Sequence, residues 1–383
     1  MVKNRNIKLR GLSLFANVGV AEAYLESLGV HMEIANELLE ERARFYQDVY
    51  PQTHMIQGDI TDDVLRTSII EEAREKKVNF VMATPPCQGM SRVGKMEEFD
   101  VRNQLIYYAV DVIKRLKPEY VLIENVTTIL KTKISVNGEI MIIPEYLKRE
   151  LGSDYNFNKE TKVKAMYYSI PQMRLRNIYL LVRKDRNVTW EFPPHTPIVN
   201  LKEAIGNLPS LDPELREGME MTLEKFPDFE KKRTEALKIS PWHRPPLHSW
   251  KLVECMIHTA SNESATKNPI YYPKKDNGER VKAHYNQYRR LSWDTPSRCL
   301  TQNNGVISSL ACVHPGRPYK KNGEILYSDP RVFSIYEIMI ISSLPLDWPI
   351  PSWANETLIR KVIGEGVPSK LIKVIMEVLL KQL

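Results

Sequence analysis

The sequence of 383 residues predicts an α/β protein, with an open, mostly parallel sheet of Rossmann type and a smaller irregular domain. Short continuous apolar runs at 80–83 and 120–123 are typical of parallel strands that are covered on both faces. Helical sequence separates such runs, which is the alternation of a doubly wound sheet. The irregular domain is predicted over 190–293, where prolines, aromatic residues and charges mix without long periodic helices.

Composition narrows the function classes. A net charge of +7 favours an anionic partner such as nucleic acid, although surface lysines that only keep the protein soluble would explain the charge about as often. Cys87, Cys255, Cys299 and Cys312 have no CxxC spacing, so we expect reduced thiols in a cytosolic protein. No apolar run approaches the roughly 20 residues that a membrane helix needs.

The first strand, LSLFANVGV, is expected to end in a tight turn at Gly19 that leads into a helix over 21–28. A second strand over 31–36 delivers Glu37 about twenty residues after the turn, where a nucleotide-binding βαβ unit has its ribose-binding acid. Asp59 follows the next short strand and could accept from an adenine amino group, although a helix cap is the commoner role. The turn lacks GxGxxG, which counts against a nicotinamide or flavin dehydrogenase.

The stretch NFVMATPPCQGMS presents a thiol just beyond a buried strand. Pro85 and Pro86 end that strand, so Cys87 lies where open α/β sheets carry their chemistry. A lone cysteine is more often a small buried hydrophobe. The next buried strand ends in Glu124, and burial of its carboxyl group would favour the protonated form, which can act as an acid. The alternative is a purely structural role, in which Glu124 caps a helix or accepts a hydrogen bond from a backbone amide.

Two later segments indicate contact with a polar ligand. In PQMRLRNIYLLV, strand geometry puts Gln172, Arg174 and Arg176 on one face, which favours a polar or anionic cleft over surface decoration. Between 238 and 293, basic residues alternate with aromatic ones, which suits phosphate contact and base recognition. A solvated, loop-rich face would look similar.

The remaining elements follow from local signals. Helical sequence is expected up to Tyr50, and the acidic stretch 212–235 is expected to contain a helix that faces solvent. A long amphipathic helix from about Leu105 to Lys117, hairpins at Asn137-Gly138 and Asn322-Gly323, a helix over 335–342, and a glycine turn over 364–368 before a last helix complete the set.

In their order along the chain, these segments resemble the DNA cytosine-5 methyltransferases, over nearly all of the chain outside the irregular region. The matching strings are LFANVGV, the acid Glu37, GDI at 58–60, PPCQ at 85–88, DxRNxL from Asp100, ENV at 124–126, QxRxR at 172–176 and the turn at 364–368.

The resemblance implies a Rossmann-like, S-adenosylmethionine-dependent methyltransferase sheet with a target-recognition domain. It implies a catalytic and cofactor-binding domain over 1–185, a target-recognition domain and hinge over 186–319, and a segment over 320–383 that returns to complete the catalytic domain. Such an enzyme flips a cytosine out of duplex DNA, transfers a methyl group to carbon 5 and leaves S-adenosylhomocysteine.

Residue roles are implied in the same way. Cys87 would add to carbon 6 of the cytosine, Glu124 would bind ring nitrogen 3 and the exocyclic amine, and Arg174 and Arg176 would hold the base. Cofactor contacts are implied for Phe15, Ala16, Asn17, Gly19, Glu37, Asp59, Ile60, Pro86, Leu105, Glu365 and Val367. DNA contacts are expected at Gln88, Ser91, Arg244, Lys251, Arg280, Arg289 and Arg290.

Two positions depart from the family pattern. Asn17 stands where the family usually has glycine, and Glu365 stands where it usually has asparagine. Both positions are near the cofactor, so the departures predict either a compensated pocket or weakened cofactor binding.

We expect a monomer that acts on double-stranded DNA in the prokaryotic cytoplasm, without a metal or a membrane. It would be the modification enzyme of a restriction-modification system, with an endonuclease that acts separately. The alternatives are a tRNA cytosine-5 methyltransferase and a non-catalytic DNA-binding subunit. An amino-directed DNA methyltransferase would need Asp or Asn before the two prolines, where this chain has Thr84.

Overall fold

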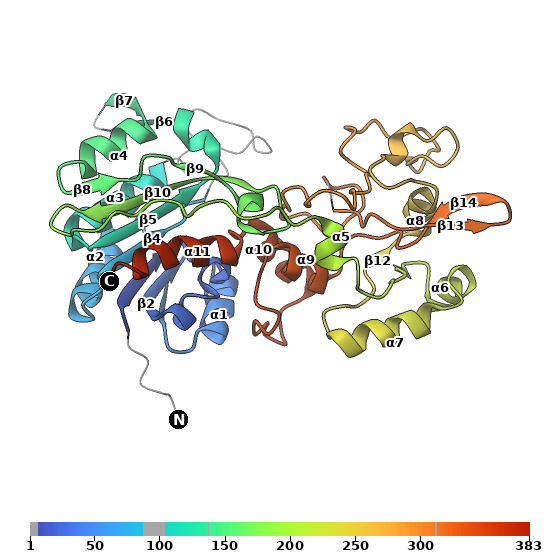
Figure 1. Cartoon of the computed structure of the whole chain (residues 1–383), viewed down its shortest axis with the longest axis horizontal. Helices are drawn as coiled ribbons and strands as arrows, with labels where there is room; N and C mark the ends of the chain where they lie inside the picture. The colour runs from blue at the N-terminus through green and yellow to red at the C-terminus, as the bar shows by residue number, and fades with distance from the viewer. Residues whose placement is uncertain (1–6, 87–103, 137, 311) are drawn as a thin grey trace.

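The computed structural model describes residues 7–86, 104–136, 138–310 and 312–383, and its centre is an eight-stranded sheet (Figure 1). The strand order is β3-β2-β1-β4-β5-β10-β8, and β9 also pairs with β10. The first five strands are parallel, whereas β10 runs antiparallel to β5. The strands are β1 Leu9–Leu14, β2 Val30–Glu37, β3 His54–Gln57, β4 Phe80–Ala83, β5 Tyr120–Asn125, β8 Tyr155–Phe157, β9 Lys162–Lys164 and β10 Leu175–Arg183.

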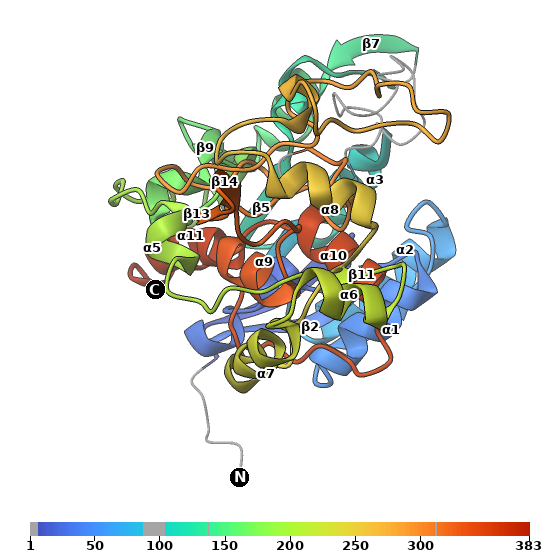
Figure 2. The same cartoon turned by 90° about the vertical axis from the view of Figure 1, so that its right-hand side faces the viewer.

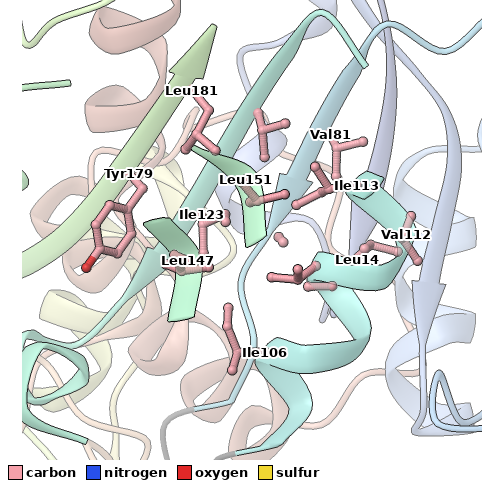
Figure 3. Packing of buried hydrophobic residues seen from close by; sticks show 14 of the residues in the cluster. Leu14, Val81, Ile106, Val112, Ile113, Ile123, Leu147, Leu151, Tyr179 and Leu181 are labelled. Atoms are coloured by element: carbon pink, nitrogen blue, oxygen red, sulfur yellow. The ribbon is translucent and has the colours of Figure 1, made fainter. Parts of the chain in front are cut away.

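Helices cover both faces of the sheet. On one face, α2 (Asp63–Glu75), α3 (Leu105–Leu116) and α4 (Ile143–Leu151) share one apolar cluster with the strands. Figure 3 shows part of it, with Val81 of β4 near Ile113 of α3 and Ile123 of β5 near Leu147 of α4. On the other face, α11 (Ser369–Leu380) packs through Leu371 and Ile375. The α/β class and the continuous apolar strands are therefore confirmed.

The last helix returns to the beginning of the chain. Lys8 Nζ donates to the carbonyl of Leu380 at 3.0 Å, which ties the residue before β1 to α11. Three apolar residues of α11 and three of the first strands share one cluster: Leu371, Ile375, Leu379, Leu9, Val30 and Met32.

A second lobe extends to the right of the sheet in Figure 1, and Figure 2 views it end on. Short helices and long connections build it, as the irregular composition predicts. Its elements are α5 Leu201–Ile205, β11 Glu214–Leu215, α6 Met219–Lys225, α7 Phe229–Ile239, β12 Leu247–His248, α8 Trp250–Ile257, β13 Pro318–Lys321 and β14 Glu324–Tyr327. Helices α9 (Ile335–Ile341) and α10 (Glu356–Glu365) then lie between this lobe and the sheet.

Most of the expected smaller elements are confirmed. The two hairpins are β6 (Lys133–Val136) with β7 (Glu139–Ile142), and β13 with β14. The helical stretch before Tyr50 is α1 (Glu40–Val49), and the acidic stretch holds α6 and α7. The chain described here contains no helix with the length and apolar character needed to cross a membrane.

The expected helix over 21–28 is wrong. Two short 3₁₀ turns occupy this stretch, at Val20–Glu22 and Glu26–Leu28. Gly19 and Gly29, in left-handed conformations with φ of 75° and 81°, close its two ends. Backbone hydrogen bonds in this stretch run three residues back, for example from the N–H of Glu22 to the carbonyl of Gly19 and from that of Leu25 to Glu22, which is the 3₁₀ pattern.

Candidate active site

The carboxyl edge of the sheet brings Glu124 and Arg176 together. Glu124 is the second-last residue of β5, and it pairs with Ile178 of the antiparallel β10. Arg176 therefore lies just beyond the end of β5. Arg176 Nε lies 2.8 Å from Glu124 Oε1. Glu124 is 7% exposed, and burial raises its pKa against the opposing effects of Arg176 and Arg174. The carboxyl group therefore holds a proton more readily than an exposed glutamate.

Arg174 has a different setting from Arg176. Its guanidinium donates to the carbonyls of Leu300 and Gly364 at 3.0 Å and to that of Glu365 at 2.7 Å. These bonds tie the start of β10 to the end of α10. The expectation that Gln172, Arg174 and Arg176 share one strand face is wrong, because β10 begins only at Leu175. Arg176 alone lies on the strand and reaches Glu124, whereas Arg174 joins chain segments and Gln172 donates to the carbonyl of Ile341 at 3.5 Å.

The segment that leads to Cys87 reaches the same edge. Asn125 Nδ2 donates to the carbonyl of Pro85 at 3.0 Å, so the end of β5 is joined to the chain just beyond β4. Pro86, with which the described range 7–86 ends, is half-buried. Cys87, Gln88 and Ser91 lie outside the described residues, and their assignments stay predictions.

The predicted cofactor residues surround the turn that follows β1. Phe15, Asn17 and Gly19 all have positive φ, of 59°, 50° and 75°, so the chain from Phe15 winds tightly around Ala16. A Cβ atom at Gly19 would lie 2.2 Å from the ring of Tyr50, which explains why the position needs glycine. The carboxylate of Glu37 accepts from the backbone N–H of Asn17 at 2.9 Å. The end of β2 therefore holds the turn in place.

Asn17 and Glu365, the two departures from the family pattern, contact each other. Asn17 Nδ2 donates to Glu365 Oε2 at 3.2 Å, and Arg42 Nη2 donates to the same oxygen at 2.8 Å. Arg42 is on α1, so the contact joins three segments that are distant in the sequence. Asn17 Oδ1 is buried and has no hydrogen-bond partner among the described residues.

The other predicted cofactor residues lie at or near this edge. Asp59 is exposed in the loop before α2, and its carboxylate accepts from the backbone N–H of Thr61 at 2.9 Å. It is not a helix cap, because Asp62 caps α2. Ile60 and Val367 are buried, and Leu105 is partly buried at the start of α3.

Three predicted DNA contacts are exposed basic residues of the second lobe. Arg244 lies over the ring of Trp242, and Lys251 Nζ lies 2.8 Å from Asp276. Arg280 stacks on Tyr272 and donates to the carbonyl of Thr266 at 2.9 Å.

The expectation for Arg290 is wrong. Its side chain is fully buried and donates to the backbone carbonyls of Met256, His314 and Asp329. Because these carbonyls occupy the guanidinium inside the lobe, Arg290 cannot reach DNA. Its pKa is lowered to about 9, chiefly by burial. Its neighbour Arg289 is 8% exposed and lines a surface hollow.

The sequence patterns missed Arg42 and Cys299. Cys299 Sγ lies 3.3 Å from Arg174 Nη1. Burial acts to raise the pKa of the Cys299 thiol, but Arg174 and Arg176 outweigh it and the net shift is downward. No periodic signal marks these residues, because contacts between distant segments bring them to the site.

Comparison with known proteins agrees with this geometry. The family model described as C-5 cytosine-specific DNA methylase matches residues 9–381. The Type II methyltransferase M1.HgaI of Avibacterium volantium is 38% identical over 370 residues, which cover 95% of this chain and 96% of that protein.

Two solved structures share the fold. A protein described as a DNA modification methyltransferase encoded within an E. coli prophage superposes with a TM-score of 0.67 at 21% identity, over 98% of this chain and 99% of the other. The S. pombe Dnmt2 methyltransferase superposes with a TM-score of 0.55 at 14% identity, again over 98% and 99%. At these identities the likeness concerns the fold alone.

Proposed function

The chain belongs to the C-5 cytosine-specific DNA methylase family, and from that premise we propose that it methylates a flipped cytosine in double-stranded DNA through a covalent adduct of Cys87. It is a DNA cytosine-5 methyltransferase, and the family uses S-adenosylmethionine as methyl donor. The observation that most supports the proposed chemistry is the buried pair of Glu124 and Arg176, at the edge to which the segment before Cys87 is tied.

The proposed roles divide between a nucleophile and an acid. The Cys87 thiolate adds to carbon 6 of cytosine, and the ring electrons move toward carbon 5 and nitrogen 3. Glu124, whose pKa is raised by burial, donates its proton toward nitrogen 3, while Arg176 holds the carboxyl group in position. After methyl transfer, nitrogen 3 returns its proton to Glu124 and the proton on carbon 5 passes to water. The ring double bond between carbons 5 and 6 re-forms as the carbon–sulfur bond breaks, and the thiolate of Cys87 is released.

The turn at Phe15 to Gly19 fits a bound S-adenosylmethionine, which supplies an electrophilic methyl group. The buried, unpartnered Asn17 Oδ1 offers an acceptor to a donor such as the α-ammonium group. Glu37 and Asp59 would take the ribose hydroxyls and the adenine amine, with Ala16, Ile60, Pro86, Leu105 and Val367 around them. Glu365 would lie beside Asn17, with its carboxylate held by Arg42.

We further propose that the second lobe reads the DNA sequence and that the enzyme acts as a monomer in a prokaryotic cytoplasm. The relative named as a Type II methyltransferase supports a role in a restriction-modification system, with a separate endonuclease as partner. The exposed Arg244, Lys251 and Arg280 are the proposed DNA contacts of this lobe, together with Arg289.

The test uses duplex DNA that contains 5-fluorocytosine. Once the methyl group has been added, carbon 5 carries fluorine and no proton, so the thiolate cannot be eliminated and the adduct persists. The wild-type chain should form a denaturation-resistant protein–DNA adduct in the presence of S-adenosylmethionine. Cys87→Ser should form none and should still bind DNA. Adduct formation by Cys87→Ser would refute the nucleophile assignment, and methyl transfer to tRNA but not to DNA would move the substrate to the RNA alternative.

A further inference from the structure

A surface hollow of about 310 Å³ adjoins the wall of the candidate active site. Met173, next to Arg174, lines it, and so do Arg289 and Arg298, from the second-lobe segment between α8 and β13. Cys299 also lines it, and the thiol of Cys299 is in contact with Arg174. The hollow is therefore one side chain away from the guanidinium that anchors β10.

Two guanidinium groups in this hollow share a single acceptor. Arg298 Nη1 donates to Asn286 Oδ1 at 2.9 Å, and Arg289 Nη1 donates to the same oxygen at 3.2 Å. Arg289 is held further by the side-chain oxygen of Asn262 at 2.6 Å and by the ring of Tyr285. Two positively charged guanidinium groups are thus held close to each other by uncharged side chains.

No carboxylate among the described residues lies within ion-pair distance of Arg289 or Arg298. Other arginines of the chain do have such partners, for example Arg149 with Glu139 and Arg183 with Asp185. Burial and the charge of Arg289 lower the pKa of Arg298, as expected for two like charges in a partly enclosed place. An anion with two or more oxygens would relieve this repulsion and could accept from both guanidinium groups.

We propose that Arg289 and Arg298 bind a phosphodiester of the DNA strand beside the target cytosine. The inference rests on the proposed function, because it takes duplex DNA as the substrate. It assigns to Arg298 a role that no sequence motif indicates, and it makes Asn286 a positioning residue that holds both guanidinium groups. A phosphate contact of this kind carries no sequence information, so it positions the strand and adds affinity on any duplex.

The test compares two variants that remove the free positive charge in different ways. Arg298→Gln deletes one guanidinium. Asn286→Asp keeps both arginines but supplies a carboxylate that neutralises them from within the hollow. Arg74→Gln is the matched control, because it removes the same charge from an exposed side chain on α2, in the other lobe.

The measurement is the dissociation constant for labelled duplex DNA by fluorescence anisotropy, with S-adenosylhomocysteine present, between 50 and 200 mM salt. The slope of log K against log salt should fall in magnitude by about 1 for Arg298→Gln and by a similar amount for Asn286→Asp, with equal losses on specific and non-specific duplexes. Arg74→Gln should keep the wild-type slope.

Unchanged slopes in both variants would overturn the proposal, and so would a loss of affinity for S-adenosylmethionine in place of DNA. The latter result would identify the anion as a cofactor carboxylate. Failure of the proposed function is seen separately, because the wild-type chain would then form no adduct with 5-fluorocytosine DNA.

Discussion

Asn17 and Glu365 show how two unusual residues can be explained together. Taken singly, an amide in place of glycine and an acid in place of asparagine would each disturb a cofactor pocket. In the structure the amide donates to the acid, and Arg42 balances the charge of the acid. The contact favours the compensated pocket over weakened binding, because each substitution supplies the partner of the other.

We expect Asn17→Gly and Glu365→Asn to be non-additive. Each variant alone leaves a polar partner unmatched and should weaken S-adenosylmethionine binding, whereas the double variant should recover part of the loss. The coupling free energy, from calorimetric dissociation constants, should be about 0.5–3 kcal/mol.

Asp59→Asn provides the control for this cycle. Its carboxylate bonds locally to Thr61, so the pair of Asn17→Gly and Asp59→Asn should add within about 0.5 kcal/mol. If the effects of Asn17→Gly and Glu365→Asn on the binding free energy were also additive, their contact would contribute nothing to cofactor binding.

At the scale of elements, a buried acid joins β1, the first 3₁₀ turn and α1. Glu22 is 3% exposed and accepts from Ser13 Oγ at 2.5 Å and from the hydroxyl of Tyr46. Burial raises the pKa of Glu22 to about 7, although both hydrogen bonds act to lower it. The unfolded chain loses this proton above about 4.5, whereas the folded chain keeps it until about 7. Stability is therefore lost as the pH rises through this window.

Glu22→Gln should stabilise the protein more at pH 8 than at pH 5. Removing an ionisable group whose pKa is raised from 4.5 to about 7 should produce a difference of about 2.5 kcal/mol in unfolding free energy between the two pH values. Urea unfolding at both pH values measures it, with the exposed Glu41→Gln on α1 as control. The same effect of Glu22→Gln at both pH values would contradict the assignment.

Sequence patterns predict helices and strands well where the local sequence alone determines the structure. The strands at 80–83 and 120–125 follow from continuous apolar runs, and both hairpins follow from Asn-Gly turns. The helix expected over 21–28 is wrong because this stretch, bounded by the left-handed Gly19 and Gly29, forms two separate 3₁₀ turns.

Charged side chains are harder to place than elements. Arg290 fits a basic, DNA-binding pattern, yet backbone carbonyls from distant segments hold it inside the lobe. Arg176 beside Glu124 follows from strand geometry, whereas Asn17 beside Glu365 does not, because 348 positions separate the two. A single sequence contains no signal for such long-range contacts.

Across the whole molecule, a buried network of charges joins the second lobe to α9. Arg331 pairs with Asp329 and Glu337, and His314 and His248 lie buried beside them. Chiefly because of burial, the pKa is lowered to about 4 for His314 and to about 3 for His248. Both rings are therefore neutral in the folded protein at neutral pH.

This network should make the protein labile to acid. Below about pH 6.5 the unfolded chain protonates both histidines and the folded chain does not, so stability falls with pH, by up to about 2.7 kcal/mol per pH unit between about pH 6 and 5. His248→Gln, which can still accept from the N–H of Val332, should reduce this slope by about one half.

Urea unfolding at pH 7, 6 and 5 measures the slope. The exposed His54→Gln on β3 is the control and should leave it near the wild-type value. Equal slopes for His248→Gln and the wild type would show that His248 is not a source of the acid lability.

The contact between Lys8 and Leu380 also bears on how the chain is connected. Because Lys8, just before β1, contacts Leu380 at the end of α11, a short linker could join these two points, and the chain could be reopened at the exposed turn at Gly323 in the β13–β14 hairpin. Such a circular permutant would keep β1 against α11 and Asn17 against Glu365. We therefore expect the cofactor site at the carboxyl edge of the sheet to depend on the spatial order of the segments and not on their order along the chain.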